Sequence, residues 1–159
     1  MKKGAMNNVK NTIGLVLLSI LLFACQASDK PAQSDATKTE TEAKVTGKNR
    51  IEILDFYGTH RCTTCQNIEA NTRYTLEKAF SQEVKDGTIV FKTINFDKKE
   101  NEEIVTEYMA YGTSLFFNVI VDGKENHIDL SEFSFKWGDN QAKYATQLEA
   151  KIREQLKKL

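Results

Sequence analysis

Two cysteines three positions apart, Cys62 and Cys65, are the residues of this sequence best suited to do chemistry. They enclose two threonines, and the pattern that follows them is helical. A dithiol at this spacing can close into a small ring without large backbone movement. A thiolate at a helix start meets unpaired N–H groups and the positive end of the helix dipole, which lower a cysteine pKa from about 8.5 to roughly 3.5–7.5. We therefore predict that Cys62 attacks a partner and that Cys65, one turn further in, resolves the mixed disulfide.

Two further side chains, His60 and Arg61, directly precede the cysteine pair. A cation at this place would stabilise the thiolate. Because that favours the reduced form, it would also make the couple more oxidising. The alternative is that both residues belong to a solvated loop, and the sequence leaves both interpretations open.

The same two thiolates could instead hold a soft ion such as Cu(I), Zn(II) or As(III). A structural zinc site needs four ligands, and outside the pair only His60, His127 and Cys25 remain. Gln66 stands where a c-type haem attachment site needs histidine. No glycine-rich dinucleotide fingerprint and no nucleophile elbow are present. We therefore predict no resident metal and no cofactor, while capture of copper or arsenite stays open.

A permanently oxidised Cys62–Cys65 bond in a binding module is another interpretation of the pair. A disulfide that closes so short a loop stabilises a protein little through chain entropy. This argues against a purely structural bond.

The first 24 residues differ in kind from the rest of the chain. Three lysines and no acid precede or accompany an apolar run at 13–24. Twelve residues are too few to cross a hydrocarbon core, which takes roughly 20 in a helix. A basic start and a short apolar centre are typical of a secretory signal peptide.

The end of this run, Leu22-Phe23-Ala24-Cys25, resembles the lipobox of bacterial lipoproteins. The resemblance implies cleavage before Cys25 and acylation of its sulfur, which would tether the protein to a membrane through more than one chain. An uncleaved anchor or an ordinary signal with an incidental cysteine are the alternatives. In each case the rest of the chain would lie outside the cytoplasm, in the cell envelope, where disulfides persist.

The remaining sequence divides into a linker and one domain. Residues 25–49 are polar, contain the single proline and cannot bury enough apolar surface to fold. We predict a flexible tether at 25–49 and one folded domain at 50–159. With 22 basic and 22 acidic residues in 159, the chain has no excess of cations for nucleic acid. The composition, 40% hydrophobic and 28% charged, also excludes a collagen-like chain, a disulfide-rich mini-scaffold and a polytopic membrane protein.

Apolar periodicity in the predicted domain alternates between strand and helix. The second helix is predicted from an Asn101 cap to a stop at Gly112, with Ile104, Tyr108 and Tyr111 on its apolar face. Asp122-Gly123 is a strong hairpin signal. Strands are predicted at 51–57, 88–95, 115–121 and 125–130; helices at 62–80, 101–111 and from 138–140 to 159, the last with a stripe of Ala145, Leu148, Ile152, Leu156 and Leu159.

The order β-α-β-α-β-β-α predicts a mixed sheet flanked by helices. A strand ending in Asp55-Phe56, a CxxC opening a helix and a later Asp-Gly-Lys turn resemble the thioredoxin-like fold. The resemblance implies an α/β fold over 51–159, and a protein thiol or disulfide as partner.

A narrower resemblance rests on the segments 58–65 and 94–96 and on the ending from Asp129. These are similar to thioredoxin-like proteins found with bacterial arsenic-resistance genes and named as a nitrophenyl-compound nitroreductase subunit family. That name implies a reductive role, including that of a non-catalytic reductase subunit.

Three departures from thioredoxin affect the site. Thr63-Thr64 replaces the usual Gly-Pro, which should shift the redox potential. Ser114 stands where thioredoxins have a cis-proline facing the dithiol, and we expect a trans peptide because a cis non-proline bond costs about 2.5–4 kcal/mol. Asp55 lies seven residues before Cys62, where thioredoxin places its buried acid six before. The resemblance implies that Asp55 accepts a proton from Cys65; the alternative is a solvated carboxylate on the strand.

Overall fold

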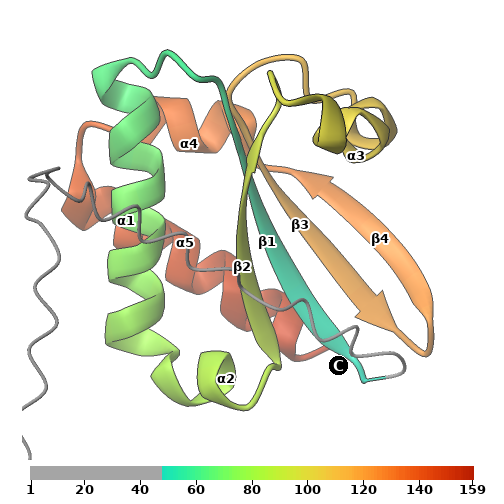
Figure 1. The fold of residues 1–159 in the computed structure, drawn as a ribbon. Coiled ribbons are helices and arrows are strands. Elements are labelled where there is room, and N and C mark those ends of the chain that lie inside the picture. Colours follow the sequence, from blue (N-terminus) through green and yellow to red (C-terminus); the bar gives the residue numbers. More distant parts are fainter. Residues whose placement is uncertain (1–47) are drawn as a thin grey trace, which may run out of the picture. The chain divides into compact units, whose positions relative to one another are not determined.

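The computed structural model describes residues 48–159, which belong to the second of two compact units, Glu42–Leu159. The predicted signal peptide, the lipidation site Cys25 and nearly all of the predicted linker lie outside the described residues. The elements are shown in Figure 1. In chain order they are β1 Arg50–Tyr57, α1 Thr63–Ala79, α2 Ser81–Lys85, β2 Ile89–Asn95, the 3₁₀ helix η1 Lys99–Asn101, α3 Glu102–Tyr108, β3 Ser114–Val121, β4 Lys124–Asp129, α4 Ser131–Trp137 and α5 Gln141–Leu156.

The four strands form one mixed sheet in the order β2-β1-β3-β4. β1 runs parallel to β2 and antiparallel to β3, and β3 pairs antiparallel with β4. The β1-α1-β2 crossover requires the parallel pair, while Asp122 and Gly123 close the hairpin with φ of 51° and 75°, as a type I′ turn demands. This strand order with these directions is the thioredoxin-like arrangement, so the predicted α/β fold is confirmed.

The sheet buries a different core on each face. Alternate residues of β1 point to opposite sides: Ile51 and Ile53 join the larger core beneath α1 and α5, and Leu54 and Phe56 join a smaller one beneath α3. Figure 1 shows α1 and α5 on one side of the sheet and α3 on the other. The predicted apolar face of the first helix is confirmed, because all four of its residues are buried: Ile68, Thr72, Leu76 and Phe80.

The second predicted helix is shorter than expected. α3 ends at Tyr108, and Met109 takes the left-handed conformation with φ 51°, so Gly112 does not terminate the helix. Tyr111 is consequently 69% exposed and not part of an apolar face. The residue that ends a helix in the left-handed backbone conformation is usually glycine. The sequence pattern therefore indicated Gly112, and not Met109, as the end of this helix.

Asn101 is the N-cap residue of α3, as predicted, and Glu102 and Glu103 stand in the first turn of the helix. The Asn101 side chain makes no capping hydrogen bond to α3. Its Nδ2 instead donates to the carbonyl oxygen of Asn95 at 2.8 Å. The residue therefore ties the start of α3 to the end of β2.

Two short helices, α2 and α4, were not predicted, because five and seven residues are too few to display a helical period. The start of α4 is held by the Ser131 N–H, which donates to Asp129 Oδ1 at 2.7 Å. The buried face of α5 differs slightly from the predicted stripe, which included Ala145, Leu156 and Leu159. It consists of Tyr144, Leu148, Ile152 and Gln155. Among residues 48–159, no helix has the length and apolar character needed to cross a bilayer.

Candidate active site

The two cysteines stand at the start of α1, and the structure joins them in a disulfide with the Cα atoms 5.0 Å apart. Cys62 is the N-cap residue, with extended backbone at φ −71° and ψ 164°. Its Sγ accepts the N–H of Cys65 at 3.0 Å. Cys62 is exposed, whereas Cys65 is only 8% exposed. A partner can therefore reach the first sulfur, while the second faces the protein interior.

The loop that carries Cys62 is held by residues just after β2. The Thr59 N–H donates to Asp97 Oδ2 at 2.6 Å, and Asn95 Nδ2 donates to Thr59 Oγ1 at 3.3 Å. Gly58 passes so close to Phe96 that an added Cβ would lie 2.8 Å from its ring. A side chain at this crossing would displace the Phe96 ring. His60, at the tip of this loop, is exposed.

Arg61 is turned inward. Its Nη2 donates to the Cys65 carbonyl at 3.0 Å and approaches Asp55 Oδ2 at 3.4 Å, and its Nη1 donates to Glu69. The guanidinium carbon also lies 4.5 Å from the centroid of the Tyr57 ring. The interpretation of Arg61 as a solvated loop residue is therefore wrong. Its guanidinium group faces the carboxylates of Asp55 and Glu69.

Asp55 is fully buried on β1, which rules out the solvated carboxylate that was the alternative for this residue. Burial raises its pKa from 3.8 to about 7, and the nearby Arg61 charge offsets only part of that rise. One carboxylate oxygen, Oδ1, has no hydrogen-bond partner. The group can therefore hold or release a proton near neutral pH.

Glu69 on α1 is the second acid that Arg61 contacts. Burial alone would raise the pKa of Glu69, but hydrogen bonds from Arg61 and Arg73 outweigh it and the net pKa is lowered. Arg61 Nη1 forms a short contact with Glu69, whereas its approach to Asp55 is longer, at 3.4 Å. Arg61 is thus shared between the two acids, and its closer contact is with Glu69.

The α4–α5 connection contacts the segment between the cysteines, a feature that the sequence did not predict. Thr64 Oγ1 donates to Asp139 Oδ1 at 3.0 Å, and Asn67 Nδ2 donates to the same oxygen at 3.1 Å. One turn on, Asn71 Nδ2 donates to the Gly138 carbonyl at 2.7 Å. The spacing of Thr64, Asn67 and Asn71 along one helix face was the available signal, because neighbours at i+3 and i+4 share a face. These three residues form a polar stripe whose side chains need hydrogen-bond partners.

Ser114 begins β3 and pairs with Phe56 on β1, so it lies at the sheet end from which the Cys62 loop leaves. It is 9% exposed, and its hydroxyl donates to the Gly112 carbonyl at 3.0 Å. The trans peptide predicted there stays a prediction. The structure brings Asp55, Arg61 and Cys65 into one contact network and leaves His60 outside it.

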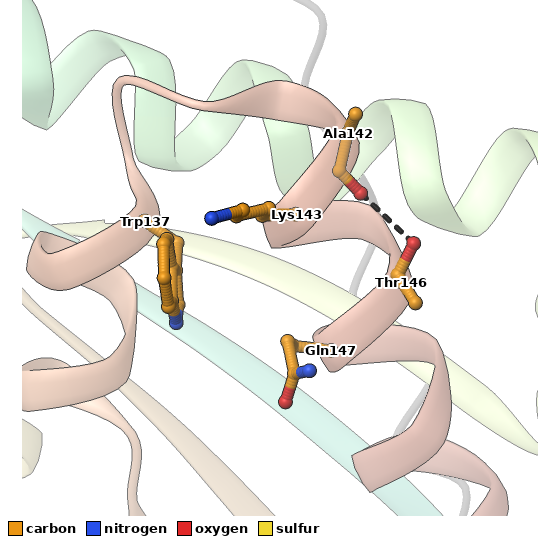
Figure 2. A pocket seen from close by; sticks show the side chains of 5 residues that line it. All are labelled: Trp137, Ala142, Lys143, Thr146 and Gln147. Carbon is orange, nitrogen blue, oxygen red and sulfur yellow. Dashed lines mark hydrogen bonds between the residues drawn. The ribbon is translucent and has the colours of Figure 1, made fainter.

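A hollow of about 450 Å³ lies at the junction of α4 and α5 (Figure 2). Trp137 forms one wall, and Lys143 Nζ lies 4.7 Å from its ring centroid. Figure 2 shows Thr146 on the opposite side, donating to the Ala142 carbonyl at 2.9 Å. The lining, completed by Gln147, holds no cysteine, histidine or carboxylate.

Comparison with known proteins gives structural neighbours only. No protein-family model matches the chain, and no curated protein matches it. A thioredoxin from Fasciola hepatica is 24% identical, with 56% of this chain and 77% of that chain covered and a TM-score of 0.38. A thioredoxin from Thermus thermophilus is 20% identical, with 62% and 73% covered and a TM-score of 0.42. Because these scores are low, the assignment of the thioredoxin-like fold rests on the strand order and directions.

Proposed function

We propose that this protein is a thiol–disulfide oxidoreductase that acts through Cys62 and Cys65. The observation that carries the proposal is the asymmetry of the pair at the start of α1: an exposed Cys62 as the N-cap and a buried Cys65 one turn later. An attacking sulfur must be accessible, and a resolving sulfur must be close to it but shielded from the partner.

The exchange proceeds in two displacements. In the reducing direction, the Cys62 thiolate attacks one sulfur of a partner disulfide and releases the other as a thiolate. The Cys65 thiolate then attacks Cys62 Sγ, which forms the intramolecular disulfide and releases the partner's second thiolate. Two electrons pass to the partner, whose two thiolates take up the two protons that Cys62 and Cys65 gave up. The reverse sequence oxidises a partner dithiol.

Asp55 is the proposed proton acceptor for Cys65. A buried carboxyl with a pKa of about 7 can take the Cys65 proton during resolution and return it to solvent at neutral pH. Arg61 connects the two, because its Nη2 contacts both the Cys65 carbonyl and Asp55 Oδ2. Arg61 is thus a positioning residue that limits how far the pKa of Asp55 rises.

A trapping experiment tests the exchange in the full-length protein. Cys65→Ser should accumulate a mixed disulfide with its partner, visible on non-reducing gels and released by dithiothreitol. Cys62→Ser should give none, and the double variant sets the background. Cys25→Ser in the Cys65→Ser background is the matched control that excludes trapping through the third cysteine. Equal trapping by Cys62→Ser, or none by Cys65→Ser, would overturn the proposal.

A second measurement distinguishes thiol–disulfide exchange from capture of a soft ion by the dithiol. Protein purified under reducing conditions is analysed for copper, zinc and arsenic, and is assayed for reduction of insulin disulfides. Exchange predicts catalytic insulin reduction that Cys62→Ser abolishes. One tightly bound ion per chain without exchange activity would instead favour capture.

We also propose that the protein acts in the cell envelope, tethered by a lipid on Cys25. The support is the Leu-Phe-Ala-Cys sequence after a short apolar run, and a polar segment long enough to serve as a tether. Metabolic labelling with a radioactive fatty acid should mark the wild-type protein and not Cys25→Ser. Labelling that survives this substitution would contradict the lipid assignment while leaving the redox proposal intact.

A further inference from the structure

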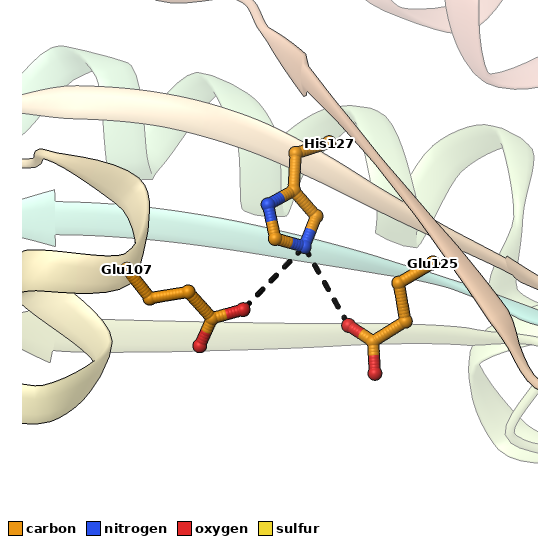
Figure 3. Close-up of side chains that lie close together, drawn as sticks. All are labelled: Glu107, Glu125 and His127. Carbon is orange, nitrogen blue, oxygen red and sulfur yellow. Dashed lines mark ion pairs between the residues drawn. The ribbon is translucent and has the colours of Figure 1, made fainter.

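Three ionisable side chains meet on the face of the sheet opposite the dithiol. Glu125 and His127 lie on β4, and Glu107 comes from α3 (Figure 3). One ligating atom of each lies within 4.8 Å of those of the other two. In Figure 3 both carboxylates point toward the same imidazole nitrogen, Nε2, from different elements. The cluster therefore joins α3 to the β3–β4 hairpin.

The distances in this cluster are too long for hydrogen bonds. His127 Nε2 lies 3.6 Å from Glu107 Oε1 and 3.5 Å from Glu125 Oε2. An N–H donor normally approaches an oxygen to about 2.7–3.2 Å. Zinc bonds to nitrogen and oxygen are about 2.0–2.2 Å, so the ligands of a tetrahedral site lie about 3.4 Å apart. The observed separations match that edge length.

The ring of His127 is held in orientation by Tyr108. The two rings are stacked, with centroids 4.1 Å apart and planes at 18°. Tyr108 is itself only 6% exposed, so it is a firm platform. Metal-binding histidines are typically held in orientation by neighbouring groups, most often through a hydrogen bond from the second ring nitrogen; here the Tyr108 ring fixes the plane of the imidazole. Nε2 is directed at the two carboxylates before any ion arrives.

Asn118 adds a buried polar group next to the three charged side chains. It pairs directly with His127 across β3 and β4, and it is 3% exposed. Its Nδ2 donates to Glu125 Oε2 at 2.7 Å, so the side chain is aimed at the cluster. Its Oδ1 is buried and has no hydrogen-bond partner. A buried oxygen without a donor costs about 1–3 kcal/mol, so this side chain still needs a positive partner.

The electrostatic balance of the cluster is negative. Among residues 48–159, neither Glu107 nor Glu125 has a lysine or arginine nitrogen within 4.0 Å; the ion pair of each is with His127. The site thus attracts a cation, and its two carboxylates face each other without full compensation.

We propose that Glu107, Glu125 and His127 bind a divalent transition-metal ion, with zinc as the best fit. One imidazole nitrogen and two carboxylate oxygens make three protein ligands, which leaves a fourth position for water. The nitrogen ligand disfavours Mg²⁺ and Ca²⁺, and the absence of sulfur in this set disfavours Cu(I). The bound ion would fasten α3 to β4. This site is independent of the dithiol and does not rest on its proposed function.

Calorimetric titration of the full-length protein with zinc chloride tests the proposal. The protein is first oxidised, so that Cys62 and Cys65 are in their disulfide, and Cys25 is then alkylated; no thiolate competes for the ion. We expect one zinc ion per chain. Substitution of any single ligand (His127→Gln, Glu125→Gln or Glu107→Gln) should weaken binding by at least about 10–100-fold, the loss typical even of outer partners of a site.

Two matched variants serve as controls for the zinc titration. His60→Gln removes the other histidine, and Glu103→Gln removes an exposed glutamate of α3 that is not in the cluster. Both should bind zinc as the wild type does. Thermal unfolding gives the second readout: excess zinc should raise the wild-type Tm and leave that of His127→Gln unchanged. Absence of stoichiometric binding, or equal binding by wild type and His127→Gln, would overturn the proposal.

Discussion

The two faces of the sheet each carry a cluster of charged side chains, and burial separates them. Beneath the dithiol, fully buried Asp55 shares Arg61 with Glu69. On the opposite face, Glu107 and Glu125 flank His127, and the side chains of these two glutamates are about half exposed, at 51% and 52%. Each cluster combines two carboxylates with one nitrogen-containing side chain. Because the burial of these groups differs, the two clusters can do different chemistry.

Because Asp55 of the first cluster is buried, its carboxyl group keeps a proton up to near neutral pH. Removing a carboxylate from water disfavours its charged form, so Asp55 titrates near pH 7 even with a guanidinium beside it. Exposure leaves the second cluster in contact with water and accessible to an incoming cation. The comparison teaches that burial outweighs a neighbouring charge here, because the Arg61 guanidinium, which also pairs with Glu69, offsets only part of the rise in the pKa of Asp55.

Asp55→Asn should have the largest effect, because it removes the buried acid and keeps its shape. The native state holds the Asp55 proton up to about pH 7, while the unfolded chain loses it near 3.8. Wild-type stability therefore falls as pH rises from about 4 to 7, by about 4 kcal/mol from this group alone. Denaturant unfolding of both proteins at several pH values should show the variant becoming relatively more stable across that window. A difference independent of pH would mean that Asp55 is ionised in the folded protein.

Arg61→Met removes the positive charge from the same cluster. Both carboxylates lose their shared cation, and we expect a loss of about 3 kcal/mol in the free energy of unfolding at pH 8. The loss should be smaller at pH 5, where Asp55 is already protonated. Arg73→Met is the control, since Arg73 also pairs with Glu69 but is 57% exposed, and it should cost under about 1 kcal/mol. Equal losses from the two substitutions would show that burial does not distinguish these pairs.

The fold was predictable from the sequence because its signals were local and strong. The apolar strand at 51–57, the helical spacing from Ile68 to Phe80 and the Asp122-Gly123 turn each report one element, and together they allow few topologies. Met109 was not predictable, because a methionine seldom takes the left-handed backbone conformation that it has here.

The site was predictable in its cysteines and only partly in its surroundings. The spacing of Cys62 and Cys65 is by itself enough to predict a dithiol site. The inward turn of Arg61 toward Glu69 depends on the irregular loop before α1, whose path no periodicity encodes. The Thr64–Asp139 contact spans 75 positions, so only the folded chain reveals it.

The exposed cluster should contribute little to folding when no metal is present. His127→Gln removes two contacts at 3.5 and 3.6 Å, and we expect the free energy of unfolding in the presence of a chelator to change by under about 1 kcal/mol. Denaturant titration at low and high salt checks this, since screening should shrink the effect further. A loss as large as that of Arg61→Met would show that exposure does not separate the two clusters.

The smallest expected effect concerns Asp139, an exposed carboxylate next to the dithiol. It accepts hydrogen bonds from Thr64 and Asn67 in the first turns of α1, where its charge opposes a thiolate on Cys62. Asp139→Asn should therefore stabilise the reduced form by about 0.3–1 kcal/mol and raise the reduction potential by about 6–20 mV. Equilibration with glutathione buffers measures this potential, and Glu132→Gln on α4 is the control that should leave it unchanged. A shift of the opposite sign would mean that Asp139 acts by positioning Thr64 between the cysteines, and that its charge is screened by solvent as in the exposed cluster.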